Sequence, residues 1–277
     1  MENSSVLKNT SEEEIPAVVF DRVNLAFDES VILKDLAFTL EEGHTKIILG
    51  ASGAGKSTVL KLILGLLKPD SGEIFVNGRR IDQMSEHDLM EIRSNLGMVF
   101  QEGALFDSLT VRGNVGYKLF EDSSLSLDEV NDRVEEVVGF VGLAEYIERM
   151  PSELSGGQRR RVAIARAMTD KPRVLLYDEP TAGLDPITAK SINNEIVKLR
   201  DLENVSSILV THQLRYAFYV ATHTAVVQNG RVVIEQAGPL KADEAEFIML
   251  HDASVVFEGN ATEFRNSTDP YLKMFLD

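Results

Sequence analysis

Residues 50–58 of the chain read Gly50-Ala51-Ser52-Gly53-Ala54-Gly55-Lys56-Ser57-Thr58. The pattern G-x-x-x-x-G-K-[ST] is typical of a phosphate-binding loop, in which glycines let successive backbone N–H groups converge on the phosphates of a nucleotide. In such a loop Lys56 neutralises the β- and γ-phosphates, and the Ser57 hydroxyl is offered to Mg²⁺. A short apolar run before the loop predicts a buried strand, and residues 59–67 predict a helix whose N-terminal amides favour an anion. The stretch therefore predicts an α/β fold that binds a nucleotide.

Two other apolar runs end in polar side chains. The run at 173–177 leads into Asp178 and Glu179, and the run at 206–211 leads into His212. Both are typical of buried parallel strands, and α/β sheets bind ligands at the carboxyl ends of such strands. Asp178 is predicted to hold Mg²⁺ directly or through water, Glu179 to polarise the attacking water, and His212 to contact the γ-phosphate. The other histidines lack such a context and are predicted to be surface or packing residues: His44, His87, His223 and His251.

A second glycine motif, Leu154-Ser155-Gly156-Gly157-Gln158, precedes an arginine-rich segment at 159–167. This segment predicts an amphipathic helix, and Ser155 and Gly157 would lie at its N-terminus, where backbone N–H groups form an anion site. The chain therefore carries two phosphate-binding features.

With these motifs the chain resembles the nucleotide-binding subunit of ATP-binding cassette (ABC) transporters, from about Val18 to the C-terminus. It also shows the glutamine that ends a strand in this family, Gln101, and the sequence Ala182-Gly183-Leu184-Asp185-Pro186. Phe27 lies where the family usually places an aromatic residue that stacks on adenine; a core position on an antiparallel strand is the alternative. The resemblance implies an α/β fold: a P-loop NTPase with a RecA-like, mostly parallel sheet core, an antiparallel β subdomain and a helical ABC subdomain.

The resemblance also implies how the motifs work together. Two ATP molecules, each with Mg²⁺, are buried between two copies of the chain in a head-to-tail homodimer with two-fold symmetry. The loop of one copy, with Lys56, meets residues 155–158 of the other copy, and Asp185 lines the seam. Gln101 ligates Mg²⁺ or water at the γ-phosphate. Hydrolysis removes the shared γ-phosphate, so ATP binding closes the dimer and hydrolysis opens it.

Composition and turn signals predict three parts in the chain. Acidic and polar residues dominate the N-terminus, which predicts disorder there. The motifs occupy the long middle part. The expected parts are a disordered acidic tail at 1–14, an ABC nucleotide-binding domain at 15–263 and a C-terminal tail at 264–277.

Turn signals divide the nucleotide-binding domain further. Strands within 18–40 and 72–81, with a tight turn at Asn77-Gly78, predict an antiparallel β layer. Residues 102–168 predict the helical subdomain. Residues 225–237 predict a hairpin that resembles an insertion, because ABC subunits usually carry one hairpin here and a later apolar pair matches it better.

The composition places limits on function. The 277-residue chain has 44% hydrophobic residues, enough for a full core, and no run approaches the ~20 apolar residues of a membrane span. A net charge of −16 argues against a nucleic-acid partner, because such binding relies on basic patches. The N-terminus lacks the basic and apolar segments of a signal peptide, and the chain has no cysteine. We therefore expect a cytoplasmic protein, and the resemblance to ABC transporter subunits implies that it is peripheral on the inner face of the cytoplasmic membrane.

Three short segments narrow the resemblance: 101–106, 150–153 and 211–214. They resemble the ATPase of maintenance-of-lipid-asymmetry phospholipid transporters, which implies an integral membrane permease and a periplasmic mammalian-cell-entry-domain protein as partners. An ATPase for polar amino acids or another small solute is the alternative, because the permease chooses the substrate. A soluble cassette ATPase of DNA repair or the ribosome predicts tandem cassettes, zinc cysteines or coiled coils, which the sequence does not show. A P-loop kinase or GTPase would need a phospho-acceptor lid or an Asn-Lys-x-Asp motif that recognises the base. It would not need the motif at residues 154–158.

Residues 103–106, Gly-Ala-Leu-Phe, follow Gln101 in a predicted loop. Bulky apolar side chains such as Leu105 and Phe106 are unusual in a loop. We expect them to line a groove that binds a cytoplasmic helix of the permease. The alternative is that both side chains fix the helical subdomain to its own core.

Overall fold

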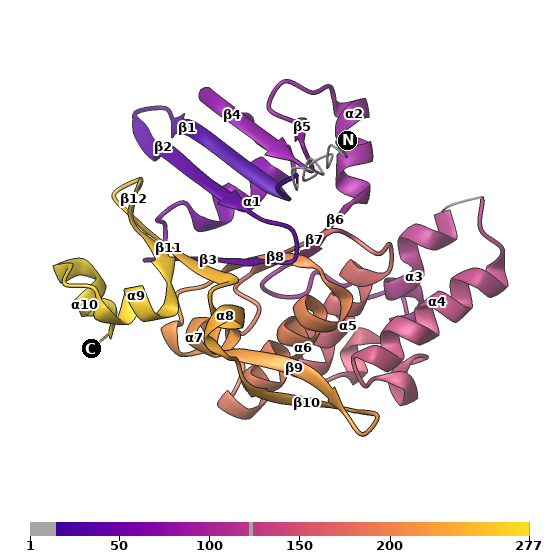
Figure 1. The fold of residues 1–277 in the computed structure, drawn as a ribbon. Helices are drawn as coiled ribbons and strands as arrows, with labels where there is room; N and C mark the ends of the chain where they lie inside the picture. Colours follow the sequence, from indigo (N-terminus) through magenta and orange to yellow (C-terminus); the bar gives the residue numbers. More distant parts are fainter. Residues whose placement is uncertain (1–14, 122–123, 277) are drawn as a thin grey trace, which may run out of the picture.

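The computed structural model describes residues 15–121 and 124–276, and the acidic tail predicted at 1–14 lies outside them. A six-stranded sheet crosses the molecule (Figure 1) in the order β12-β11-β3-β8-β7-β6. Neighbouring strands from β11 to β6 run parallel, and β12 is antiparallel to β11. The strands are β3 (Thr45–Gly50), β6 (Leu96–Val99), β7 (Val174–Asp178), β8 (Ser206–Val210), β11 (Ala245–His251) and β12 (Ser254–Asn260).

This sheet is buried on both faces because its central strands are apolar on both sides. Ile47 and Leu49 of β3 pack into one core, and Ile48 packs into the other. Such a doubly covered sheet is what continuous apolar strands predict. The first core includes side chains of α5 (Gly156–Met168), α6 (Pro186–Glu203) and α7 (Leu214–Thr222), and the second includes those of α1 (Lys56–Ile63).

An antiparallel sheet with the order β2-β1-β4-β5 packs on the second core. The turn between β4 and β5 has Asn77 and Gly78 at φ values of 48° and 74°, as expected of a tight hairpin turn. This sheet is the antiparallel layer that the sequence predicts. Its elements are β1 (Val18–Phe27), β2 (Ser30–Leu40), β4 (Ser71–Val76) and β5 (Arg79–Arg80), followed by α2 (Glu86–Ser94).

The helical subdomain consists of α3 (Val111–Glu121), α4 (Leu127–Phe140) and α5, at one side of the molecule (Figure 1). Ser126 and Glu129 form a capping box at the start of α4, in which each side chain accepts a hydrogen bond from the other residue's backbone N–H. Apolar residues of α4 at intervals of three and four face the core, as the sequence period predicts. Two 3₁₀ turns, Ala144–Tyr146 and Pro151–Glu153, lead into α5.

A separate two-stranded sheet lies where the inserted hairpin is predicted. It consists of β9 (His223–Gln228) and β10 (Arg231–Gln236) and is followed by α8 (Pro239–Ala242). The buried Asp201 carboxylate of α6 holds its base by accepting hydrogen bonds from the Thr224 hydroxyl at 2.9 Å and the Ala225 N–H at 2.7 Å. Near the tip, Val227 is 64% exposed. The hairpin therefore packs at its base and projects at its tip.

Replacing residues 226–233 by a short Gly-Ser link is expected to leave ADP affinity unchanged within about twofold, because exposed hairpin tips tolerate such changes. Isothermal titration calorimetry and thermal melting measure the outcome. The control variant Asp201→Ala keeps the hairpin but removes its buried anchor, and it is expected to lower the melting temperature. A shortened protein that melts normally but no longer binds ADP would show that the hairpin contributes to the nucleotide site.

The C-terminal residues form two short helices instead of the tail expected from residue 264 onward. They are α9 (Ala261–Asn266) and α10 (Pro270–Leu276). The Asp269 carboxylate caps α10 by accepting hydrogen bonds from the N–H groups of Tyr271 and Leu272, and Leu272 is fully buried. A helix of seven residues is too short for an apolar period to show in the sequence. Among the residues that the structure describes, no helix is both long and apolar enough to cross a membrane.

Candidate nucleotide-binding and hydrolysis site

The carboxyl ends of the parallel strands bring the predicted residues to one edge of the sheet. β3 leads into the loop at 51–55, β7 ends at Asp178, and β8 leads into Thr211 and His212. Parallel strands have their carboxyl ends at the same edge, which is where open α/β sheets bind ligands. The site is therefore a direct consequence of the strand order.

The loop at 51–55 turns the chain from β3 into α1. Gly53 and Gly55 have φ values of 82° and 93°, which favour glycine. A Cβ atom at Gly55 would also lie 3.0 Å from the carbonyl oxygen of Ile32 on β2. α1 begins after Gly55 without a side-chain cap, so its first backbone N–H groups can bind an anion.

Lys56, the first residue of α1, bends back over this loop. Its Nζ donates to the carbonyl oxygens of Gly50 at 2.9 Å and Ala51 at 3.0 Å, and lies 4.0 Å from Glu179 Oε1. Burial lowers the pKa of Lys56, and the nearby carboxylates of Glu179 and Asp178 oppose this shift. The ammonium group is thus held at the mouth of the phosphate-binding loop.

Ser57 and Asp178 form a pair of oxygen ligands beside Lys56. The Ser57 hydroxyl donates to Asp178 Oδ1 at 2.9 Å. Burial raises the pKa of Asp178, and the hydrogen bond from Ser57 opposes this shift. Hydroxyl and carboxylate oxygens suit Mg²⁺, which commonly binds through one or two carboxylates together with substrate phosphates. The donor set therefore fits Mg²⁺, even though no group of three His, Asp or Glu side chains forms a metal cage within the described residues.

Glu179 is held from three directions. Its backbone has a φ of 48°, uncommon for a residue other than glycine, and its N–H donates to the Val210 carbonyl at 2.9 Å. Its Oε1 lies 2.7 Å from His212 Nδ1, and its Oε2 accepts a hydrogen bond from the Thr211 hydroxyl at 3.2 Å. Glu179 is only 8% exposed, whereas half of the His212 side chain is exposed. The carboxylate is thus fixed between the core and the solvent-facing imidazole.

The second glycine motif forms the start of α5. The Ser155 hydroxyl accepts a hydrogen bond from the Gln158 N–H at 3.3 Å, and Gln158 Oε1 accepts one from the Ser155 N–H at 2.8 Å. A Cβ atom at Gly157 would lie 2.2 Å from Thr188 Cγ2 on α6. A side chain at 157 would therefore displace Thr188, so glycine favours the packing of α5 on α6 whatever else the motif binds.

Asp185 caps the neighbouring helix α6. Its Oδ1 accepts hydrogen bonds from the N–H groups of Ile187 at 3.0 Å and Thr188 at 3.1 Å. Hydrogen bonds from the side chain and backbone of Thr188 lower the pKa of Asp185, so it is ionised. Within the described part of the chain, no hydrogen bond or ion pair joins Asp185 or residues 155–158 to Lys56. In the described residues, Lys56 instead contacts the Gly50 and Ala51 carbonyls and the Glu179 carboxylate.

Gln101 is exposed in the loop that follows β6. Two arginines of α5 hold this loop by its backbone. Arg160, 6% exposed, donates to the Phe100 carbonyl at 2.8 Å, and Arg166 donates to the Gly103 and Ala104 carbonyls at 2.8 and 2.7 Å. Burial lowers the pKa of both arginines. The sequence predicted a helix for this arginine-rich segment but did not predict which groups its arginine side chains contact.

Phe27 ends β1 with 46% of its surface exposed, which excludes the core position that the sequence left open. It lies opposite Ser30 in the hairpin that joins β1 and β2. Two residues further along β2, the Ile32 carbonyl faces Gly55 of the phosphate-binding loop. Nearly half of the Phe27 surface is therefore open to a planar ligand.

Comparison with known proteins agrees with this geometry. A family model described as "ABC transporter" matches residues 33–182. Protein TRIGALACTOSYLDIACYLGLYCEROL 3, chloroplastic, of Arabidopsis thaliana is 38% identical over 258 residues, covering 90% of this chain and 70% of that protein. The chain therefore belongs to the ABC transporter family.

Import proteins of bacteria are also similar. The methionine import ATP-binding protein MetN of Cereibacter sphaeroides is 41% identical over 229 residues, covering 80% of this chain and 64% of MetN. The sulfate/thiosulfate import ATP-binding protein CysA of Synechococcus elongatus is 42% identical over 217 residues, covering 78% of this chain and 61% of CysA. This chain thus spans less than two thirds of the length of either import protein.

Two solved structures share the fold. One is CbiO1 of Clostridium perfringens, part of the ABC transporter complex CbiONQ, with a TM-score of 0.77 and 28% sequence identity. The match covers 95% of this chain and 96% of CbiO1. The other is the dimeric ATP-binding cassette MJ0796 in a post-hydrolysis state with ADP and Pi, with a TM-score of 0.71 and 29% sequence identity. The match covers 88% of this chain and 98% of MJ0796. The chain is accordingly an ABC cassette that binds and hydrolyses ATP.

Proposed function

We propose that this chain is the ATPase subunit that powers a phospholipid transporter, bound to a membrane permease on the cytoplasmic face. The relative whose name is that of a lipid, TRIGALACTOSYLDIACYLGLYCEROL 3, supports this cargo because its match extends over 90% of the chain. A periplasmic mammalian-cell-entry-domain protein is the third partner in this proposal. The second candidate is an importer of a small polar solute, which the similar identities of MetN and CysA support.

The convergence of five side chains at one sheet edge carries the proposal for ATP hydrolysis: Lys56, Ser57, Asp178, Glu179 and His212. The backbone N–H groups at the start of α1 would bind the β- and γ-phosphates, with Lys56 moving from the loop carbonyls to phosphate oxygens. Ser57 and Asp178 would hold Mg²⁺, with Gln101 as a further ligand. When bound, Mg²⁺ neutralises charge on the phosphate oxygens.

Glu179 would act as the general base. Its carboxylate lies 4.0 Å from Lys56 Nζ, and hydrogen bonds with Thr211 and His212 hold it in place. From that position it would orient the attacking water and take its proton. His212, half exposed beside it, would contact the γ-phosphate with the ring nitrogen that does not face Glu179.

A second copy of the chain would complete each site. The start of α5 offers an anion site capped by Ser155, and among the described residues it makes no hydrogen bond or ion pair with Lys56 of its own chain. In a head-to-tail dimer this helix start would reach the γ-phosphate bound by the other copy, with Asp185 at the seam. The dimeric state of the similar cassette MJ0796 supports this arrangement.

A groove beside the Gln101 loop would receive the permease. It has a volume of about 500 Å³, and its lining includes Met90, Phe100, Phe106 and Tyr117, all of which are exposed. The rings of Phe106 and Tyr117 pack at 4.6 Å between centroids. Exposed aromatic and methionine side chains in one groove suit the apolar face of a helix. Because the arginines of α5 hold the same loop, nucleotide-dependent movement would reach the groove.

Phe106 and Leu105 have different positions, so their substitution should separate docking from folding. Phe106→Ser is expected to weaken co-purification with the permease and leave the melting temperature unchanged. Leu105→Ser is the matched control: Leu105 packs against the main core, so the loss should be in stability, by about 1–3 kcal/mol. Transport and assembly at normal levels with Phe106→Ser would refute the docking role.

The cargo can be decided by reconstitution. The chain is co-purified with its permease from membranes, inserted into liposomes and supplied with ATP, and movement of fluorescent phospholipid is compared with uptake of radiolabelled methionine and sulfate. The proposal expects ATP-dependent lipid movement that is lost in the Lys56→Ala variant. Uptake of methionine or sulfate without lipid movement would favour the small-solute importer.

A further inference from the structure

Two tight turns leave the sheet at neighbouring strand ends, and each carries one residue of the candidate site. The first follows β6: the Gly103 N–H donates to the Phe100 carbonyl at 2.9 Å, which closes a turn that contains Gln101. The second follows β7: the Ala182 N–H donates to the Glu179 carbonyl at 3.1 Å. Because β6 and β7 are parallel neighbours, both turns start at the same edge of the sheet.

One buried side chain of α5 donates hydrogen bonds to both turns. The Nη1 of Arg160 donates to the Phe100 carbonyl at 2.8 Å, and its Nη2 donates to the Ala182 carbonyl at 3.4 Å. Arg166 holds the loop after β6 further along, but among the described residues it makes no hydrogen bond with the turn that begins at Glu179. Arg160 therefore links two turns that are far apart in the sequence.

The guanidinium group of Arg160 suits this link because it is planar, so its two terminal nitrogens keep a fixed separation. The two carbonyls that it binds cannot move apart without the loss of a hydrogen bond. Burial of a charged group is costly unless its N–H groups are hydrogen-bonded, so the same two bonds keep the side chain in one position.

The helix that carries Arg160 is itself fixed at its start. The reciprocal hydrogen bonds between Ser155 and Gln158 cap α5, and Gly157 packs closely on Thr188 of α6. The guanidinium therefore reaches both turns from a rigid support, on the helix whose start forms the second anion site.

We propose that Arg160 is a positioning residue for ATP hydrolysis, which holds the turn with Gln101 and the turn that begins at Glu179 in one arrangement. The inference rests on the proposed roles of Gln101 and Glu179. Arg160 acts through two backbone carbonyls. Because a misplacement of about 1 Å can cost a reaction about 10²-fold in rate, the link affects the rate of hydrolysis. Binding of the phosphates depends on other contacts, those of the loop at 51–55 and Lys56.

Arg160→Met tests the proposal, because methionine has a similar length and no N–H group in its side chain. In the assembled transporter, kcat is expected to fall by about tenfold to 10²-fold while the KM for ATP stays within about twofold. Titration calorimetry of the full-length chain with ADP and MgCl₂ should give the normal affinity. Arg160→Gln, whose amide can donate to one of the carbonyls, should recover part of the kcat.

Two further variants separate positioning from folding. Arg161 is the next residue of α5 and donates to the Ser191 hydroxyl at 3.0 Å, and among the described residues it makes no hydrogen bond with either turn. Arg161→Met therefore also removes an arginine from α5 but should keep the normal kcat. Combining Arg160→Met with Gln101→Ala should cost less than the product of the two separate losses, because both substitutions act on the same turn.

Normal kcat in Arg160→Met would overturn the proposal. An equal loss of kcat in Arg161→Met, a weaker ADP affinity in Arg160→Met, or losses of Arg160→Met and Gln101→Ala that multiply in full would also overturn it. Glu179→Gln is measured beside these variants. If Glu179→Gln abolishes turnover while Arg160→Met is normal, the positioning role fails and the proposed base stands; if both turn over ATP normally, the proposed base fails as well.

Discussion

The Glu179→Gln variant is expected to bind ATP but to hydrolyse it about 10²- to 10⁴-fold more slowly in the assembled transporter. Glutamine has nearly the same shape and keeps an oxygen that can accept the hydrogen bond from Thr211. The neutral amide, however, does not accept a proton from the attacking water. ATP that stays intact should then hold two copies together, so gel filtration with ATP and MgCl₂ is expected to show a dimer.

Two variants serve as controls for this result. Glu246→Gln removes a carboxylate of β11 that pairs with Lys46, and it should turn over ATP at the normal rate. Thr211→Val removes only one of the contacts that orient Glu179, so its effect should be smaller, about tenfold or less. Normal turnover by Glu179→Gln would exclude Glu179 as the base and shift attention to the neighbouring His212.

The sequence predicted the parts of the fold and site whose signals are local. The phosphate-binding loop could be predicted from its glycines, because the turn into α1 requires positive φ values at Gly53 and Gly55. Asp178 and His212 are readable because each follows an apolar run long enough to define a strand and its end. The hairpin turn at Asn77-Gly78 could also be located from sequence, because these two residue types favour the positive φ values of a two-residue turn.

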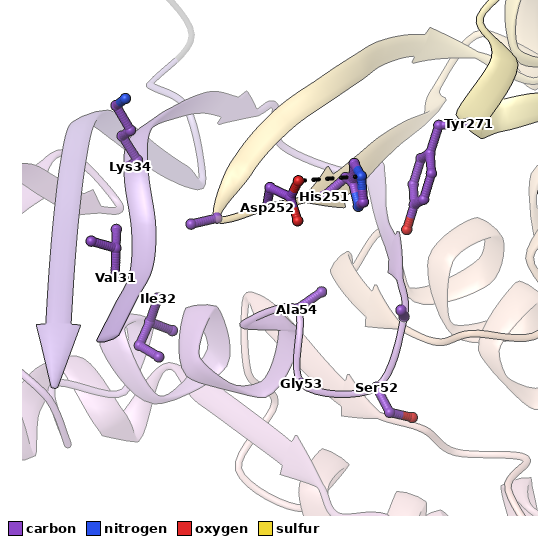
Figure 2. A pocket seen from close by; sticks show the side chains of 11 residues that line it. Val31, Ile32, Lys34, Ser52, Gly53, Ala54, His251, Asp252 and Tyr271 are labelled. Atoms are coloured by element: carbon purple, nitrogen blue, oxygen red, sulfur yellow. Dashed lines mark ion pairs between the residues drawn. The ribbon is translucent and has the colours of Figure 1, made fainter. Parts of the chain in front are cut away.

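The parts that the sequence did not predict depend on contacts between distant segments. His251 lies beside the loop because β11 pairs with β3, and Tyr271 of α10 stacks on His251 there (Figure 2). No sequence signal near residue 250 predicts that register. Leu105 and Phe106 are adjacent and equally apolar, yet one packs into the core and the other lines the groove. Their separation depends on buried Asn114, which fixes the Phe106 backbone with hydrogen bonds from 2.7 to 3.0 Å.

The second glycine motif shows that a binding motif in the sequence can also have a role in folding. The sequence assigned residues 155–158 to phosphate binding, but the structure gives two of them a folding role as well. Ser155 caps α5, and Gly157 makes room for Thr188. A substitution at Gly157 would therefore disturb the packing of α5 on α6 before any effect on ATP could be measured. Tests of the motif need a variant that keeps the cap.

Mixing Lys56→Ala copies with Ser155→Asp copies is expected to restore ATP hydrolysis that neither variant shows alone. Aspartate caps a helix about as well as serine, but its charge repels a phosphate at the start of α5. Each variant alone should lose about 10²-fold or more in activity, because every composite site then lacks one phosphate-binding group. In a mixed dimer, one site combines both defects and the other has none.

An equimolar mixture is expected to contain about one quarter of the normal number of intact sites, because about half of the dimers are mixed and each has one intact site of two. The ATPase rate of the mixture, titrated from one variant to the other, measures this. Lys56→Ala mixed with Glu179→Gln is the control: both groups serve the nucleotide bound by their own chain, at 4.0 Å from each other, so no mixed dimer has an intact site. Recovery in the first mixture and none in the second is the result that only a site shared between two copies can give. Activity of the Ser155→Asp variant alone at the normal rate would instead place the whole reaction within one chain, and the start of α5 would then have no part in it beyond folding.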